Sequence, residues 1–159
     1  MIVIADTGPI NYLICISEIE VLPKLYGGIL VPPAVYAELR SPRAPELVRN
    51  WITSPPSWLE MRIPSQAPDA ELLEADLDAG ERDAILLAQE MGADELIIDE
   101  RRGRREAQRG HLTFTGTLGV LRAASNEGLI DLKGVVDRPR QTNFYIAQNV
   151  LDQLFKDQH

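Results

Sequence analysis

The sequence of 159 residues contains one cysteine, two histidines and no long hydrophobic run. A lone cysteine, Cys15, cannot form an internal disulfide bond and excludes a zinc site built from several cysteines. In the apolar stretch YLICI it is expected to be a small core residue. No run approaches the roughly 18 apolar residues of a membrane span, and no basic segment precedes the first apolar run as in a signal peptide. We therefore expect a soluble, cytoplasmic protein with no membrane partner.

The two histidines offer little for a histidine-based metal site, because His111 begins an expected strand and His159 is the last residue. Carboxylates are far more numerous: 24 Asp and Glu residues against 16 Lys and Arg give a net charge of −8. An acidic protein is not a general nucleic-acid coat, since such proteins gain affinity by neutralising phosphates. Surplus carboxylates are compatible with an enzyme that binds cations.

The charge is distributed unevenly along the chain. Residues 69–83 carry seven acidic residues and one arginine, whereas residues 101–110 carry five arginines and one glutamate. Such an asymmetry is typical of separate acidic and basic surfaces.

Short apolar runs that alternate with amphipathic stretches predict an α/β fold with a parallel sheet covered by helices on both faces. Strands are expected at residues 2–6, 28–31, 57–64, 95–99 and 111–116. Helices are expected within 9–27 and at residues 32–40, 45–52, 69–77, 80–91, 100–109, 117–126 and about 144–157. The length and composition suit one domain over residues 1–159.

Two of these strands end in a carboxylate. Asp6 follows the run IVIA, and Asp99 follows ELII. The carboxyl ends of parallel strands share one edge of the sheet, where ligands of open α/β folds bind. The alternative for Asp6 is a structural role as the N-cap of the following helix.

Two helices can bring further carboxylates to this edge. Glu38 lies beside the apolar stripe of its helix, although a solvated position next to Arg40 is an equal alternative. Glu81 is centred on the buried stripe of helix 80–91, whereas Asp83 falls on the opposite side. The alternative for Glu81 is a capping box with Asp78 as the N-cap.

Four carboxylates at one edge repel each other unless a cation lies between them. Oxygen ligands without His or Cys suit Mg²⁺ or Mn²⁺, and metal-assisted hydrolysis of a phosphodiester is the natural chemistry of such a site. Basic residues follow Asp99 directly and could hold the backbone of an RNA or DNA strand. An ordinary solvated helix face is the equal alternative for these residues, which are Arg101, Arg102, Arg104, Arg105 and Arg109.

Five motifs, in order, are ADTGPI, VPPAVYAEL, LDAGERDAILLA, LIIDERRGR and FTGTLGVL. Together they resemble the PIN-domain family, most closely its bacterial and archaeal VapC-like branch, which has the DTGP start and the GTLGVL motif. The similarity extends from residue 1 to about residue 130. It implies a three-layer α/β/α PIN-like fold around a parallel sheet of about four or five strands.

The resemblance also implies roles for individual residues. The metal-holding and catalytic acids map onto Asp6, Glu38, Glu81 and Asp99, with Glu100 as an auxiliary ligand. Many members have Asp at the third of these positions, where the candidates here are Glu81 and Asp83. Hydroxyl residues would line the site, with N-capping as the alternative for the last of them: Thr7, Thr115 and Thr117.

The implied activity is that of a ribonuclease that hydrolyses RNA phosphodiesters with Mg²⁺- or Mn²⁺-activated water. Members of toxin–antitoxin pairs act on RNA and are blocked by a small antitoxin protein, and a homodimer is expected. One alternative is a PIN-like module that binds nucleic acid or protein without catalysis. The other is a receiver-like signalling domain that binds Mg²⁺, although the strand LTFTG lacks the lysine expected there.

Overall fold

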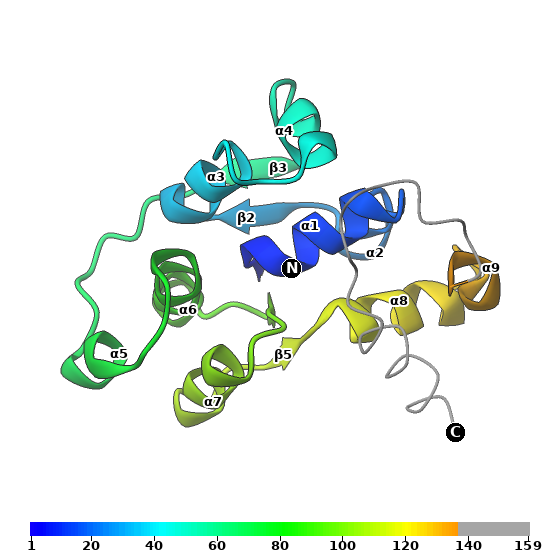
Figure 1. The fold of residues 1–159 in the computed structure, drawn as a ribbon. Coiled ribbons are helices and arrows are strands. Elements are labelled where there is room, and N and C mark those ends of the chain that lie inside the picture. The colour runs from blue at the N-terminus through cyan, green and yellow to red at the C-terminus, as the bar shows by residue number, and fades with distance from the viewer. Residues whose placement is uncertain (137–159) are drawn as a thin grey trace.

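A five-stranded parallel sheet forms the centre of the fold (Figure 1). The computed structural model describes residues 1–136. The strand order is β3-β2-β1-β4-β5, with Ile4 of β1 paired with Leu30 on one side and Leu96 on the other. The strands are β1 Val3–Ala5, β2 Ile29–Val31, β3 Leu59–Met61, β4 Glu95–Ile97 and β5 Phe114–Thr115.

Helices flank this sheet and complete three α/β/α layers, as expected from the sequence. Figure 1 shows α1 at the centre of the view, with α3 and α4 above it and α7 and α8 below. Helix α1 contacts α3, α4 and α8, while α6 contacts α3, α7 and strands β1 and β4. The helices are α1 Thr7–Cys15, α2 Val21–Tyr26, α3 Pro33–Leu39, α4 Glu46–Ile52, α5 Ala70–Glu74, α6 Ala79–Met91, α7 Arg101–Arg109, α8 Thr117–Asn126 and α9 Leu132–Val136.

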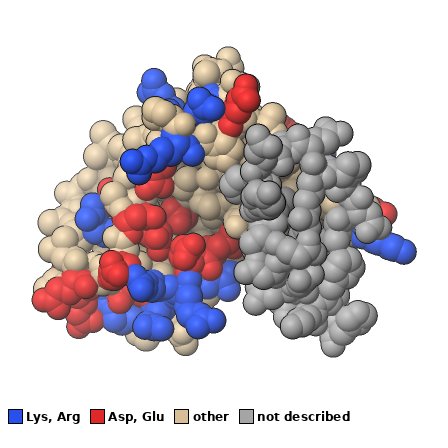
Figure 2. Space-filling view, in the orientation of Figure 1, with Lys and Arg blue, Asp and Glu red and all other residues tan. Residues whose placement is uncertain are grey.

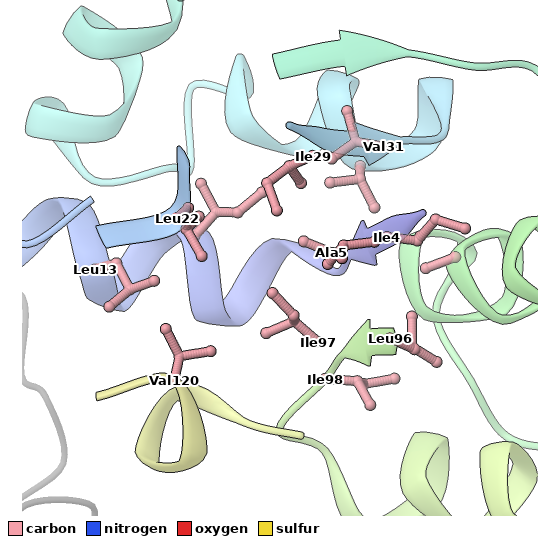
Figure 3. Packing of buried hydrophobic residues seen from close by; sticks show 14 of the residues in the cluster. Ile4, Ala5, Leu13, Leu22, Ile29, Val31, Leu96, Ile97, Ile98 and Val120 are labelled. Carbon is pink, nitrogen blue, oxygen red and sulfur yellow. The ribbon is translucent and has the colours of Figure 1, made fainter. Parts of the chain in front are cut away.

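Strands β1 and β2 are apolar at every position, and β4 is apolar after Glu95, because both faces of the sheet are covered. All three residues of β1 are buried, and β4 is followed by a further buried residue, Ile98. Figure 3 shows side chains of these strands in one apolar cluster with Leu13 of α1 and Val120 of α8. Continuous apolar runs therefore predicted the two strands that deliver Asp6 and Asp99.

Most expected elements are present, with shorter strands than the sequence suggested. Strand β5 begins at Phe114 rather than residue 111, because His111 adopts a left-handed turn conformation with φ of 59°. Helix α9 was not predicted from the sequence. The expected C-terminal helix at about 144–157 lies outside the described residues, and the single-domain assignment stays a prediction.

Acidic helix α5 and basic helix α7 are joined by ion pairs. Arg102 pairs with Asp76, which follows α5, and Arg109 lies 3.5 Å from Asp69 and 2.9 Å from Glu71. Exposed pairs of this kind contribute little to stability, because water and salt screen them. Part of the acidic segment 69–83 and part of the basic segment 101–110 therefore pair with each other on the surface of the protein.

Among residues 1–136, no helix has the length and apolar character needed to cross a membrane.

Replacing a buried isoleucine at the centre of the sheet should destabilise the protein far more than replacing an exposed one. Ile97 in β4 is fully buried, whereas Ile63 after β3 is 68% exposed. We expect Ile97→Ala to lower the free energy of unfolding by about 2–5 kcal/mol and Ile63→Ala to change it by less than about 0.5 kcal/mol. Urea denaturation followed by circular dichroism measures both. Equal effects would contradict the sheet described here.

Candidate metal centre

The carboxyl ends of β1 and β4 open into a pocket of about 760 Å³. Figure 2 shows acidic side chains gathered in the middle of the face drawn, beside a band of basic side chains at the position of α7. Arg101 and Arg104 contribute positive charge to the lining of the pocket. Its carboxylates come from four different parts of the chain: Asp6, Glu38, Asp78, Glu81, Asp99 and Glu100.

Asp6 is the most buried of these carboxylates, with 4% of the residue exposed. Its backbone N–H donates to the carbonyl of Ile97 at 2.9 Å and so continues the β1–β4 pairing. It occupies the N-cap position of α1, yet its side chain makes no capping bond. Among residues 1–136, its Oδ1 has no hydrogen-bond partner. The capping alternative therefore does not account for the buried carboxylate.

The electrostatic environment of Asp6 disfavours its charged form. The pKa of Asp6 is raised to about 7, mainly by burial; the Thr7 N–H lowers it, and the carboxylates of Asp78, Glu38 and Asp99 contribute to the rise. A bound cation would reverse this effect, since an opposite charge stabilises the ionised form.

Glu38 of α3 is half-buried and is held in place from two sides. The Thr7 hydroxyl and the Gly80 N–H both donate to its carboxylate, the latter at 3.2 Å. Gly80 permits this approach, because a Cβ there would lie 2.6 Å from both carboxylate oxygens. Burial raises the pKa of Glu38. Arg40 instead stacks on the Tyr36 ring, so the solvated pairing of Glu38 with Arg40 is absent.

Asp78 and Glu81 meet at the first turn of α6. The Asp78 side chain is the N-cap and accepts the Glu81 N–H at 2.8 Å, so the capping interaction considered for this helix is present. Glu81 nevertheless lines the pocket with 8% of the residue exposed. Burial first, and then the Asp78 carboxylate, raise the pKa of Glu81 to about 8. Capping and pocket formation thus coexist here.

Asp99 accepts two hydrogen bonds from the first residue of α8. Its two oxygens accept the backbone N–H and the hydroxyl of Thr117, at 2.8 and 2.6 Å. Thr117 is the first residue of α8 and Gly116 is its N-cap, so N-capping by Thr117 was a wrong expectation. The helix N-terminus stabilises a negative charge at Asp99.

The structure adds Asp78 to the candidate ligands. One oxygen each of Asp6, Glu38 and Asp78 lie within 4.8 Å of one another, close enough to share a cation. Only oxygen donors are present in this group, as Mg²⁺ and Mn²⁺ prefer. The sequence had suggested Asp78 solely as a cap. The signal for its second role was its place at the start of the helix that carries Glu81.

The other predicted site residues divide into two groups. The pocket is lined by four of them: Thr7, Glu100, Arg101 and Arg104. The remaining ones lie around it. Arg102 pairs with Asp76, Arg105 is exposed, Thr115 lies against Gly119, and Thr117 supports Asp99.

The sequence that forms the pocket matches a known protein family. A family model described as DUF3368, a PIN domain, matches residues 2–158, which is nearly the whole chain. A comparison with curated proteins gives no match. All residues that line the pocket fall inside the matched range.

The raised pKa values predict that the metal-free protein loses stability as pH rises. Asp6 and Glu81 keep their protons in the folded state up to about pH 7 and 8, while the unfolded chain releases them near 3.8 and 4.5. The folded state therefore binds more protons, and its free energy of unfolding falls from about pH 4 to about pH 8. Asp6→Asn should make this slope shallower.

Urea unfolding in EDTA at several pH values measures the slope. Glu127→Gln, at an exposed position after α8, provides the control and should follow the wild type. Parallel curves for Asp6→Asn and the wild type would contradict the assigned environment of Asp6.

Asp78→Asn separates the two roles of this residue. Asparagine is an equally good N-cap, so α6 should keep its stability, while the loss of one carboxylate should weaken Mn²⁺ binding. We expect Mn²⁺ affinity to fall by about 10-fold or more with little change in melting temperature. Isothermal titration calorimetry and thermal unfolding measure the two quantities. Asp83→Asn, which removes an acid outside the pocket, should leave the affinity nearly unchanged.

Proposed function

The chain belongs to the PIN-domain family, and from this premise we propose that it is a metal-dependent ribonuclease. Members of this family are generally metal-dependent nucleases. The single observation that carries the proposal is the buried Asp6 Oδ1, which has no hydrogen-bond partner among residues 1–136 and belongs to a cluster of carboxylates. Such an oxygen is costly to bury unless a cation or a donor meets it.

The residues present fit Mg²⁺ or Mn²⁺. Asp6, Glu38 and Asp78 are the nearest set of donors, and Glu81 and Asp99 reach into the same pocket. Glu100 lies on the rim as an auxiliary ligand in this proposal. A bound divalent ion lowers the pKa of water and neutralises charge on phosphate oxygens.

The protein's own groups would position these acids. The Thr7 hydroxyl holds Glu38, and the Thr117 N–H and hydroxyl hold Asp99. Both contacts fix the direction of a carboxylate before any substrate arrives, which lowers the reorganisation needed during the reaction. The catalytic acids that we propose line this pocket and are Asp6, Glu38, Glu81 and Asp99.

RNA is the proposed substrate because the sequence motifs resemble those of VapC-like toxins. On the same ground we propose a toxin of a toxin–antitoxin pair, a cognate antitoxin protein, a homodimer and a cytoplasmic location. Positive charge for the RNA backbone would come from the two arginines of α7 that line the pocket, Arg101 and Arg104, since Arg102 pairs with Asp76 and Arg105 lies outside the lining.

The observed strand order separates one of the two alternative functions, a receiver-like domain, from the proposed nuclease but does not separate the other, a binding module. A receiver-like domain has the strand order 2-1-3-4-5, whereas the order here is 3-2-1-4-5. A binding module without catalysis shares the observed order, so only an activity measurement separates it from a nuclease.

Cleavage of fluorescent single-stranded RNA tests the proposal. We expect cleavage with Mn²⁺, none with EDTA, and a rate at least about 100-fold lower for the Asp6→Asn, Asp99→Asn double variant, which lacks two of the proposed ligands. A quenched-fluorophore assay and gel analysis of the products measure this.

Asp83→Asn is the matched control, since Asp83 lies on α6 and pairs with Arg82 outside the pocket. It should cleave at nearly the wild-type rate. Metal-dependent cleavage that survives in the double variant would place the active site elsewhere. A wild type that binds Mn²⁺ but cleaves none of several RNAs would favour the binding module.

A further inference from the structure

Arg104 is the arginine of α7 that is fixed at the rim of the carboxylate pocket. Its Nε donates to the carbonyl of Ile98 at 3.0 Å, and its guanidinium carbon lies 5.6 Å from the centre of the Phe114 ring. The backbone bond and the ring therefore hold the side chain between β4 and β5. A guanidinium held in this way keeps its orientation when a ligand binds.

The remaining nitrogens of Arg104 are not committed to hydrogen bonds. Within residues 1–136, neither Nη1 nor Nη2 has a hydrogen-bond acceptor, and Nη2 lies 4.0 Å from Asp99 Oδ1. Asp99 is turned instead toward Thr117, which donates to both of its oxygens. Arg104 thus presents free N–H donors beside the pocket rather than closing a tight ion pair.

Gly116 makes room for this arrangement. A Cβ at this position would collide with Arg104 Nη2 and lie 2.5 Å from Asp99 Oδ1. The start of α8 therefore passes closely between the guanidinium and the carboxylate, where only a residue without a side chain fits.

Arg101 also lines the pocket, but within residues 1–136 no hydrogen bond or ion pair holds its side chain in one orientation. The other arginines of α7 lie outside the pocket lining. Arg102 and Arg109 pair with acidic residues of and around α5. Arg105 is exposed and does not line the pocket. Arg104 reaches Asp99 only at 4.0 Å, and its Nη1 and Nη2 have no hydrogen-bond acceptor among residues 1–136, so an anionic ligand in the pocket can accept from both.

We propose that Arg104 is a phosphate-binding residue that holds a backbone phosphate of the nucleic-acid strand next to the carboxylate cluster. The inference rests on the proposed nuclease function and assigns one cation of α7 to the substrate. The parallel N–H groups of a guanidinium match two oxygens of a phosphate. The phosphate oxygens accept from Nη1 and Nη2, while Ile98 and Phe114 keep the fork directed into the pocket.

Binding of RNA without cleavage tests this role. The probe is a short fluorescein-labelled single-stranded RNA of mixed sequence, titrated in Ca²⁺ and followed by fluorescence anisotropy, with its intactness checked on a gel. We expect Arg104→Met to weaken binding by about 10-fold or more, because a charge-assisted pair of hydrogen bonds is lost. Arg105→Met removes the same charge from the next residue and should weaken binding by no more than about twofold.

Arg104→Lys tests whether the two parallel N–H groups of the guanidinium are needed. Lysine keeps the positive charge but cannot donate two parallel hydrogen bonds, so we expect an affinity between those of the wild type and Arg104→Met. A lysine variant that binds RNA as tightly as the wild type would overturn the proposal that two parallel hydrogen bonds hold the phosphate. Equal losses in Arg104→Met and Arg105→Met would overturn the specific role of Arg104.

A second measurement excludes a purely structural role. If Arg104 only offset the charge of Asp99, its removal would tighten Mn²⁺ binding and leave RNA affinity at the level of Arg105→Met, which would overturn the proposal. Because anisotropy reports binding alone, the outcome is separate from that of the cleavage assay. A wild type that binds RNA through Arg104 but does not cleave it would refute the nuclease and retain the phosphate site.

Discussion

The rest of the site depends on the buried carboxylate of Asp6, which has little access to water. Asp6 directly follows a strand that is buried on both faces, and its backbone still pairs with Ile97. This pairing holds the Asp6 backbone at the edge of the sheet. Burial favours the protonated form of the side chain, whereas a bound cation would favour the ionised form. The arrangement that disfavours a bare carboxylate would therefore favour a positive ligand.

Neighbouring carboxylates are held by donors that do not neutralise them. Glu38 accepts from Thr7 and Gly80, and Asp99 accepts both donors of Thr117. Neutral donors orient an acid without a competing positive charge, so its oxygens stay available to a metal ion. The fold thereby assembles groups that repel each other and limits the repulsion by geometry rather than by salt bridges.

The sequence predicts the parts of this site that depend on local structure. Asp6 and Asp99 follow apolar runs, and the position of Glu81 on its helix follows from the helical repeat. The position of Asp78 before the Glu81 helix shows only that it can approach the site, because its contact with the other acids depends on the packing of α6 against α3, which brings the Asp78 and Glu38 oxygens together. The difference between Arg104 and Arg105 likewise depends on the positions of Ile98, Phe114 and Gly116.

Opposite charges are kept apart across the pocket. The acids come from the ends of β1 and β4, from α3 and from the start of α6, whereas Arg104 comes from α7 and stops 4.0 Å short of Asp99. A full ion pair would satisfy both groups and remove the need for a ligand. Thr117 donates to both oxygens of Asp99 but brings no positive charge, so Asp99 can still bind a cation. Ile98 accepts only from Nε of Arg104, so Nη1 and Nη2 can still donate to an anion. In the proposed complex a cation would bind the carboxylates and a phosphate would bind Arg104, and a phosphate that also contacts the cation would join the two halves of the site into one reaction centre.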